Sequence, residues 1–551
     1  MPETAPPADL PDLPKTKQPH GRAAALAVAS GILLSKIIGL IRERIFAYYF
    51  GNSMAADAFK AAFRIPNMLQ NLFGEGVLSA SFIPVYARLN AEERHDEATR
   101  TAGAIFAILV LVASLLVLAG VLLAPLLIDI IVPGFHGETR LLAIQLVRIL
   151  FPGAALPVLS AWCLGILNSH RRFFLSYTAP VVWNIAMIAT LVWQGHRLFT
   201  HGITAASVAE PRLAVALAIG SVIGSALQFL IQTPTVLRLL SPLQWKATFG
   251  SEHVRTIVRN FFPVFISRGV VQLSAFVDQV LASLLPTGAV AALSYAQTIN
   301  QLPVSLFGMA VSAAELPAMS AALGTAEQIA AKLLARLAAG LGQIAWFVVP
   351  SAVAFVVLGD VVVAAIYRTG HFNAQDVTYV WSALAGSGVG LLAGTSGRLY
   401  SSAFYALRDT RTPLNFAVIR VVLTLGLGYF FSKPLPHLLG IDSRWGVAGL
   451  TLSAGLAAWL EYSLLRRAMH QRIGVVDYPA SRVLRLWLAA IAAAVLCFLL
   501  HRHLPLHGAG ARKAILTAIA VLIPYGGLYV AFTVLLKIPI PGSLLRRFKR
   551  R

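Results

Sequence analysis

Charged and amide side chains occur inside segments of the chain that are otherwise apolar. At the 100° turn per residue of an α-helix, the polar residues of segment 57–90 fall within an arc of about 80°. These residues are Lys60, Arg64, Asn67, Asn71 and Glu75. Segment 288–322 carries a similar polar face, made of Ser294, Gln297, Gln301, Ser305, Gly308, Ser312 and Glu315. A looser polar sector occurs in segment 22–50, with Ser35, Lys36, Gly39, Arg42 and Glu43. In segment 253–285, Arg268, Gln272 and Gln279 share one side, and Asp278 lies about 100° round from it.

A charged side chain near the centre of a bilayer costs roughly 2.5–3.5 kcal/mol. We therefore expect the polar faces to turn toward one another or toward a hydrated cavity. The alternative is structural, with acids and bases paired between helices and end residues reaching the membrane surface. Lys36, Arg42, Arg64 and Arg268 outnumber the nearby acids, and guanidinium groups suit phosphate oxygens. The pattern favours a central cavity that binds an anionic, phosphorylated substrate.

The elements that would position these residues are membrane-spanning helices. The 551 residues are 57% hydrophobic and only 12% charged, and apolar blocks near 20 residues long match the hydrocarbon thickness that a helix must cross. We expect an all-α polytopic membrane protein with about fourteen transmembrane helices. The expected ranges are 22–50, 57–90, 98–131, 139–169, 174–198, 211–239, 253–285, 288–322, 326–367, 376–407, 412–432, 444–468, 481–502 and 511–537.

An internal echo suggests that one unit is used twice. Residues 72–84, which begin Leu-Phe-Gly-Glu, are echoed by residues 306–317, which begin Leu-Phe-Gly-Met. Pro66 and Pro303, and Ser35-Lys36 and Ser267-Arg268, lie at nearly the same separation. We expect two six-helix lobes, 22–240 and 241–470, related by an axis along the membrane normal, with two further helices in 471–551. Chance similarity between apolar helices is the alternative.

The net charge of +22 is placed in short loops and at the C-terminal end rather than on a soluble domain. Lys and Arg concentrate in the loops on the side of the two termini, so both termini are expected in the cytoplasm. Residues 1–21 carry six prolines and predict a disordered cytoplasmic tail, and the chain ends in a basic cytoplasmic tail. This placement argues against nucleic acid as a partner.

No catalytic constellation competes with transport. The sequence has no phosphate-binding glycine loop, no His-Glu-x-x-His and no Gly-x-Ser-x-Gly, so we expect a transporter rather than an enzyme, without a cofactor. Energy would then come from an ion gradient, the membrane potential or consumption of the substrate. Asp278 is a candidate cation ligand, with a salt bridge to Arg268 or another base as the alternative. Cys163 and Cys497 lie in apolar stretches and predict packing roles.

Seven short motifs stand out along the chain. They are Ser-Lys-Ile-Ile-Gly-Leu-Ile-Arg-Glu at 35–43, Ala-Asp-Ala-Phe at 56–59, Phe-Arg-Ile-Pro-Asn at 63–67, Phe-Gly-Glu-Gly at 73–76, Gly-Ile-Leu-Asn at 165–168, Tyr-Arg-Thr-Gly-His-Phe at 367–372 and Arg-Asp-Thr-Arg-Thr-Pro at 408–413. Together they resemble the MurJ (MviN) family of bacterial lipid II flippases, within the multidrug/oligosaccharidyl-lipid/polysaccharide exporter superfamily. The resemblance covers residues 22–470 and is most specific in its first hundred residues.

The resemblance implies fourteen helices in two lobes and alternating access to a cationic cavity in the bacterial inner membrane. The implied substrate is lipid II, undecaprenyl-pyrophosphate carrying the peptidoglycan disaccharide-peptide, and other cell-wall synthesis proteins are possible partners. Arg42 matches a cavity arginine, Asp57 an acid of the outer gate, and Glu75 the family glutamate of the second helix.

Other positions match less closely. Lys36 stands where many members have arginine, and Arg398 matches a lysine of the tenth helix. Gln70 and Thr298 replace two family arginines, and Arg268 could compensate from the seventh helix.

Three alternatives stay open at this point. One is a flippase for another polyprenyl-linked glycan. A second is a cation-coupled multidrug antiporter, which predicts an anionic cavity centred on Asp278 or Glu315. A third is a membrane scaffold without transport activity, which predicts polar faces closed into pairs and no cavity for a disaccharide.

Overall fold

The computed structural model describes residues 21–73, 75–170, 172–200, 206–240, 251–309, 311–312, 315, 319, 325–503 and 510–539. Every regular element in these ranges is a helix. This confirms the predicted all-α class. The predicted N-terminal tail, apart from residue 21, and the basic C-terminal tail lie outside the described residues.

The helices follow one another with short connections. In chain order they are α1 (Gly21–Phe50), α2 (Met54–Phe73), α3 (Glu75–Ala91), α4 (His95–Leu122), α5 (Ala124–Ile131), α6 (Gly137–Ser169), α7 (Phe173–Thr200), α8 (Ala206–Leu239), α9 (Glu252–Ser283), α10 (Ala289–Pro303), the π-helix η1 (Val304–Met309), α12 (Ala326–Val357), α13 (Gly359–Tyr367), α14 (Ala374–Ala406), α15 (Arg411–Ser432), α16 (Pro434–Leu438), the 3₁₀ turn η2 (Ser443–Trp445), α17 (Gly446–Ile473), α18 (Ala480–His503) and α19 (Ala511–Leu535).

Most predicted ranges agree with these bounds to within a few residues, but the prediction of continuous helices over 98–131 and 326–367 is wrong. Helices α2 and α3 cover the predicted range 57–90 except for residue 74, which lies outside the described residues. Leu123 separates α4 from α5, just before a proline in the first turn of α5. Leu358 separates α12 from α13. The helix geometry also changes in the second copy of the echo, where α10 passes into η1 after Pro303. Helix interruptions of this kind are tolerated in membranes where neighbouring protein satisfies the backbone.

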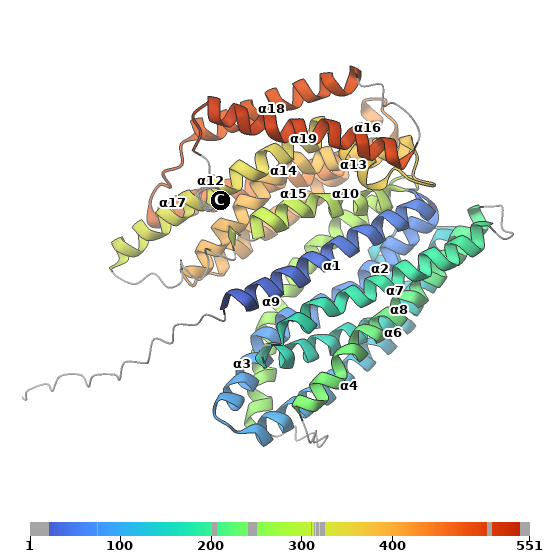
Figure 1. Ribbon diagram of the computed structural model, residues 1–551, viewed down its shortest axis with the longest axis vertical. Helices are drawn as coiled ribbons and strands as arrows, with labels where there is room; N and C mark the ends of the chain where they lie inside the picture. Colours follow the sequence, from blue (N-terminus) through green and yellow to red (C-terminus); the bar gives the residue numbers. More distant parts are fainter. Residues whose placement is uncertain are drawn as a thin grey trace, which may run out of the picture.

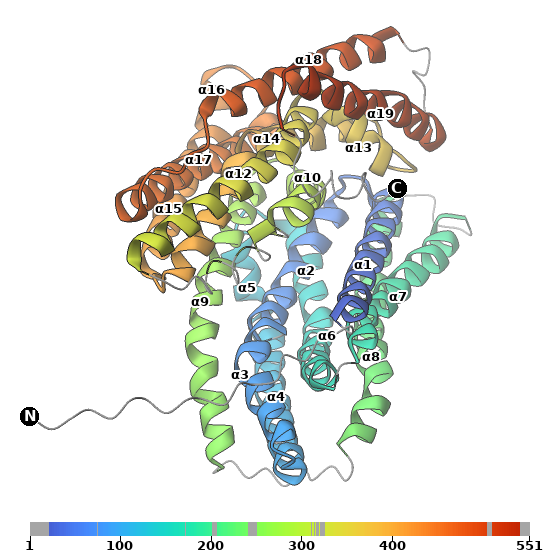
Figure 2. The ribbon, with the colours of Figure 1, turned by 60° about the vertical axis from the view of Figure 1, so that its left-hand side comes forward.

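The helices form two groups (Figures 1 and 2). In the first group α6 packs against α2, α4 and α8, and α7 packs against α1 and α8. In the second group α14 packs against α12 and α17, and the pair α18 and α19 packs against α12 and α13. Helix α9 contacts members of both groups, including α3 and α15. The helices α1, α2, α9 and α10, which carry the polar sectors, lie where the two groups meet (Figure 1).

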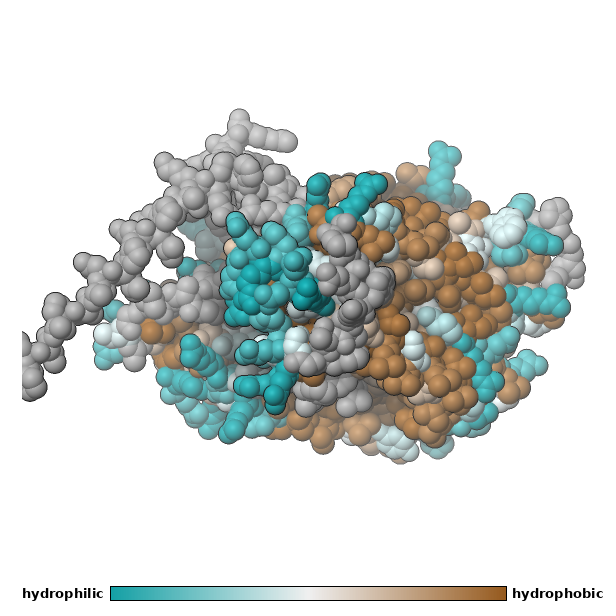
Figure 3. Space-filling view, turned by 90° about the horizontal axis from the view of Figure 1, so that it is seen from below, coloured by the Kyte–Doolittle hydropathy of each residue, from teal (hydrophilic) through white to brown (hydrophobic). Residues whose placement is uncertain are grey.

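The outer surface is suited to lipid. Ten of the described helices are long and apolar enough to cross a membrane, and α1, α2, α9 and α10 are not among the ten. Large apolar side chains are exposed along single helices, for example Leu111, Leu115 and Leu118 on α4. Figure 3 shows a broad apolar area on one face, with hydrophilic residues gathered toward its ends. The protein is therefore polytopic, and the count of fourteen spans stays a prediction.

The C-terminal hairpin is joined to the second group at a helix defect. Pro350 lies inside α12, and a proline cannot donate a hydrogen bond to the carbonyl four residues earlier, here that of Trp346. The hydroxyl of Tyr529 on α19 donates to this carbonyl at 2.7 Å, and Tyr525 donates to the carbonyl of Pro350 at 2.7 Å. Tyr529 thus replaces the missing donor from a neighbouring helix, and Tyr525 adds a second hydrogen bond to α12.

We expect Tyr529→Phe to destabilise the protein, because it leaves a buried carbonyl without a donor. Such a loss costs roughly 1–3 kcal/mol. The measurement is the thermal midpoint of the purified protein in detergent. Tyr429→Phe is the matched control, since Tyr429 is half exposed on α15 and its hydroxyl makes no hydrogen bond within the described part of the chain. Equal midpoints for the two variants would show that the Tyr529 contact contributes nothing.

Candidate functional site

The site begins at the turn between α1 and α2. Gly51 adopts a left-handed conformation (φ +52°), which lets the chain reverse between two helices. The end of α1 and the start of α2 then lie side by side and bring three charges together. The Arg42 guanidinium lies 2.8 Å from the Glu43 carboxylate, and the Lys60 ammonium pairs with the other oxygen of Glu43. All three side chains are largely buried, with 8–15% of their surface exposed.

Aromatic rings and an amide complete the surroundings of this triad. Arg42 lies 5.0 Å from the ring of Trp183 and donates to the Asn184 amide oxygen at 3.0 Å. Lys60 lies 4.3 Å from the ring of Phe46 and 5.1 Å from that of Tyr295. Ring faces attract cations most strongly where water is excluded. The triad therefore holds two bases and one acid, a net charge of one positive in a low-dielectric setting.

Asp57 connects the two groups of helices. It is buried on α2, and its carboxylate accepts backbone N–H groups of Gly288 at 2.6 Å and Ala291 at 2.7 Å. These N–H groups belong to the first turn of α10, where helix N–H groups have no partner within the helix. Gly288 has φ +94°, and a Cβ there would lie 2.7 Å from the carbonyl oxygen of Asn52. Asp57 therefore binds the N-terminus of α10.

Further contacts close the same end of the molecule. Arg44 donates to the backbone carbonyls of Ala365 and Ile366 at 2.6 and 3.0 Å. The backbone N–H of His371 donates to the Tyr48 carbonyl at 2.9 Å, and the Tyr295 hydroxyl donates to the Gly51 carbonyl at 2.9 Å. All these contacts join α1 or the turn after it to α10, α13 or the turn before α14. The two groups are thus held together at the end that carries the α1–α2 turn.

The polar faces of α2 and α10 meet farther along the same interface. Arg64 on α2 donates to the Gln297 side chain on α10 at 3.3 Å and lies 5.7 Å from the ring of Phe276 on α9. The two helices of the internal echo therefore face one another, as the polar stripes predict. Asp278 on α9 interacts electrostatically with Arg64 and Arg420. Within the described residues it forms no ion pair within 4.0 Å, and no group of acids and histidines could hold a metal ion.

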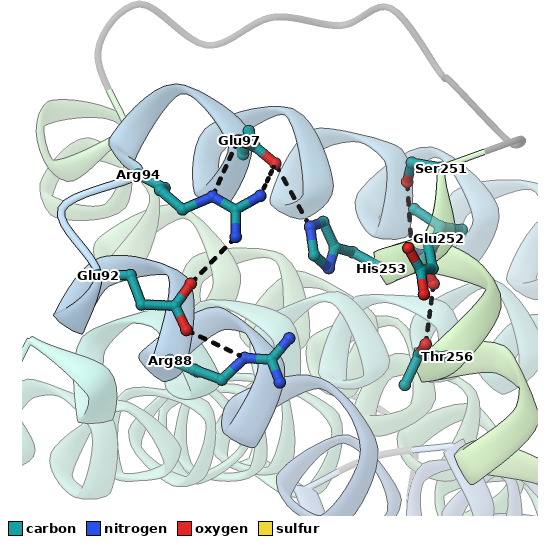
Figure 4. A network of polar contacts seen from close by, with 9 residues as sticks. Arg88, Glu92, Arg94, Glu97, Ser251, Glu252, His253 and Thr256 are labelled. Atoms are coloured by element: carbon teal, nitrogen blue, oxygen red, sulfur yellow. Dashed lines mark hydrogen bonds and ion pairs between the residues drawn. The ribbon is translucent and has the colours of Figure 1, made fainter.

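At the opposite end, charged residues join α9 to the first group of helices (Figure 4). Arg94 bridges Glu92 at 3.0 Å and Glu97 at 2.7 Å. Glu97 also lies 3.3 Å from the His253 imidazole in the first turn of α9. Ser251 caps this helix by accepting the N–H of Val254. The start of α9 is thus attached to the α3–α4 turn by side chains that are partly exposed.

The remaining predicted site residues fall in three places. Ser35 and Asn67 line a cavity inside the first group of helices, and Lys36 is exposed on α1. Arg398 is exposed on α14, where it interacts electrostatically with Arg420 and Glu461 of the second group. The side chains of Glu75, Arg268 and Gln70 lie outside the described residues, so their predicted roles remain predictions.

The cavity has a volume of about 150 Å³ and is bounded by α1, α2, α6, α7 and α8. Its lining consists of Ser35, Phe63, Pro66, Asn67, Leu150, Gly153, Ala154, Pro157, Pro180, Trp183, Asn184, Ser221, Ser225 and Gln228. No acidic or basic residue belongs to this lining. This cavity therefore lies within one group of helices, and the predicted central cavity stays a prediction.

Sequence reasoning missed the partners that fix the charges. Glu43 was placed in the polar sector of α1, but its pairing with Lys60 was not predicted, nor were Trp183 and Tyr295 beside the bases. The signal for Glu43 and Lys60 was available, since opposite charges in adjacent apolar helices tend to pair. The N–H groups of Gly288 and Ala291 carry no such signal, because every residue except proline has a backbone N–H group.

The arrangement of the helices matches that of solved membrane transporters. An inward-facing multidrug transporter of the MATE family, within the MOP superfamily, superimposes with a TM-score of 0.62 at 18% identity, covering 81% of this chain and 98% of the transporter. A solved structure described as lipid II flippase MurJ in an inward closed conformation superimposes with a TM-score of 0.72 at 22% identity, covering 93% and 99%. The chain therefore has the fold of MOP superfamily transporters.

The sequence narrows this class to one family. The family described as lipid II flippase MurJ matches residues 46–516. The lipid II flippase MurJ of Burkholderia cenocepacia is 32% identical over 488 residues, which cover 87% of this chain and 89% of the relative. The chain belongs to the MurJ family, as its sequence motifs predict.

Proposed function

We propose that this protein is a lipid II flippase. It moves the undecaprenyl-pyrophosphate-linked peptidoglycan precursor from the inner to the outer leaflet of the bacterial cytoplasmic membrane by alternating access. The observation that carries the proposal is family membership over most of the chain. The site agrees with it, because a buried cluster with net positive charge lies where the two groups of helices meet.

In this proposal, the end of the molecule at which the α1–α2 turn holds the two groups of helices together faces the periplasm. The distribution of Lys and Arg predicts both termini in the cytoplasm, so α1 would run outward and the α1–α2 turn would lie on the periplasmic side. Asp57 and Arg44 then hold the periplasmic side shut between the two lobes, 22–240 and 241–470. Rocking of one lobe against the other would break these contacts and open the central cavity between the lobes toward the periplasm.

Substrate binding is assigned to the polar residues of α1, α2, α9 and α14. Arg42 and Lys36 engage the pyrophosphate. The further contacts are assigned to Ser35, Asp57, Arg64, Asn67, Glu75, Arg268 and Arg398. In the closed state Glu43 compensates Arg42 and Lys60 only in part. An entering pyrophosphate would supply the missing negative charge, and each charge-assisted hydrogen bond to a guanidinium contributes roughly 1.5–3 kcal/mol.

The proposal requires no resident cofactor, and energy would come from an ion gradient or the membrane potential.

For Asp278 the interactions with Arg64 and Arg420 favour the role of a counter-charge over that of a cation ligand. The cavity of a cation antiporter would have an acidic lining; here the described cavity lining is neutral, and Glu315 is paired with Arg336 at 3.0 Å. These observations favour an anionic lipid-linked substrate.

The test is complementation of a bacterial strain whose own lipid II flippase can be depleted. We expect the protein to restore growth and cell shape on depletion. The protein must be shown in the membrane fraction by immunoblot. Its presence there without any rescue, in a host whose lipid II has the matching peptide, would count against the proposal.

A further inference from the structure

The cavity inside the first group of helices combines neutral polar groups with aromatic rings. Hydroxyls and amides come from four helices, and Phe63 and Trp183 supply the rings. The rings of Phe63 and Trp183 stack at 5.7 Å between centroids. The polar members of the lining are Ser35, Asn67, Asn184, Ser221, Ser225 and Gln228. Neutral hydrogen-bonding groups beside aromatic carbon match the two surfaces of a sugar ring, one polar at its edge and one apolar at its face.

Several of these polar groups have hydrogen-bonding capacity that the described residues leave unused. Ser225 and Gln228 are 4% and 7% exposed. Gln228 donates through its amide to Ser160 at 3.1 Å, whereas its amide oxygen and the Ser225 hydroxyl have no partner in the part of the chain that is described. Buried polar groups are almost always hydrogen-bonded. Both residues line the cavity, so a molecule in the cavity can supply the partners.

The cavity lies directly beside the cationic triad. Asn184 belongs to the lining, and its amide oxygen accepts from Arg42 at 3.0 Å. Trp183 likewise belongs to the lining and lies 5.0 Å from the Arg42 guanidinium. In a glycosyl diphosphate the sugar is bonded directly to phosphate. A phosphate held at Arg42 would thus place the first sugar ring next to this cavity.

We propose that the cavity is a sugar subsite that takes an N-acetylhexosamine ring of the lipid-linked headgroup. This rests on the proposed function. The volume of about 150 Å³ equals roughly five water molecules at about 30 Å³ each, which is the size class of one pyranose ring. Asn67 and Gln228 present amide groups, and Ser35 and Ser225 present hydroxyls, for the acetamido and hydroxyl substituents. The subsite selects glycosylated over bare polyprenyl diphosphate.

The test compares two lipids on the intact protein by native mass spectrometry in detergent. The probes are undecaprenyl diphosphate and undecaprenyl diphosphate carrying one N-acetylglucosamine. We expect the unaltered protein to bind the glycosylated lipid about tenfold more tightly, and Ser225→Leu, which fills the cavity and removes a hydroxyl, to lower this ratio to about one. Thr190→Val is the matched control, because the Thr190 hydroxyl bonds within α7 to the Ala186 carbonyl at 2.9 Å and lies outside the lining; it should keep the ratio.

The possible outcomes separate the two proposals. Equal affinity of the unaltered protein for both lipids, or an unchanged ratio in a folded Ser225→Leu variant, would overturn the sugar subsite and leave water as the occupant. Binding of neither lipid by the unaltered protein would instead overturn the proposed function, and the subsite with it. The thermal midpoint of each variant shows that it is folded.

Discussion

Arg42→Ala is expected to reduce lipid II transport by about 100-fold or more. The guanidinium is the strongest phosphate ligand in the triad, and its loss removes two or more charge-assisted hydrogen bonds at roughly 1.5–3 kcal/mol each. It also leaves Glu43 and Lys60 as a neutral pair, so the attraction for an anion disappears. The measurement is the rate at which lipid II becomes accessible on the outer face of cells that depend on this protein.

Two variants separate this role from a general loss of charge. Arg42→Lys keeps the charge but lacks the planar pair of donors, so partial activity is expected. Arg140→Ala removes a guanidinium from an exposed pair with Asp129 at 2.7 Å, with 34% and 49% of the two side chains exposed. Such surface pairs contribute little, and near-normal transport is expected. Wild-type activity of Arg42→Ala at normal membrane levels would remove Arg42 from the substrate site.

The second large effect is expected from Asp57→Ala, which opens the outer end. The substitution leaves the N–H groups of Gly288 and Ala291 without their acceptor, and hydrogen bonds to a charged group contribute roughly 1.5–3 kcal/mol each. The closed state should lose stability relative to the outward-open state by about 100-fold or more. Transport should fall, because one half of the cycle is no longer populated.

The opening can be measured as a distance between spin labels at Glu138 and Gln375, two exposed positions at the closed end of different groups of helices. Asp57→Ala should shift the distribution to longer distances. Asp129→Ala, which removes an exposed acid at the same end, should leave it unchanged. Cys163 and Cys497 are buried and can stay in place. Identical distributions for Asp57→Ala and the unaltered protein would show that this carboxylate does not hold the outer end closed.

The helices could be predicted from the sequence because long apolar blocks have few alternatives in a membrane. The stripe Lys60, Arg64, Asn67 was predicted on one face of α2, and Arg64 does meet Gln297 of the echoed helix. Family motifs led to Arg42 and Asp57. The polar stripe depends on local periodicity and the two motif residues on short runs of sequence, and the sequence contains both.

Contacts that depend on tertiary structure could not be predicted. Asp57 binds backbone N–H groups, and neither its partner nor the position of α10 is encoded in a local pattern. The break at Leu358 also depends on a neighbour, since a Cβ on Gly359 would lie 2.4 Å from the Trp381 ring. The cavity inside the first group arises from five helices and has no linear signature.

The most direct test of the central claim is transport by the purified protein in liposomes. Lipid II is incorporated, and its headgroup is cleaved from outside by a membrane-impermeant enzyme. We predict that the protein makes nearly all of the lipid II accessible, and that liposomes with Arg42→Ala stop near the half initially exposed, as protein-free liposomes do. Cleavage that stops at one half with the unaltered, correctly folded protein, under an imposed ion gradient and membrane potential, would contradict a flippase function.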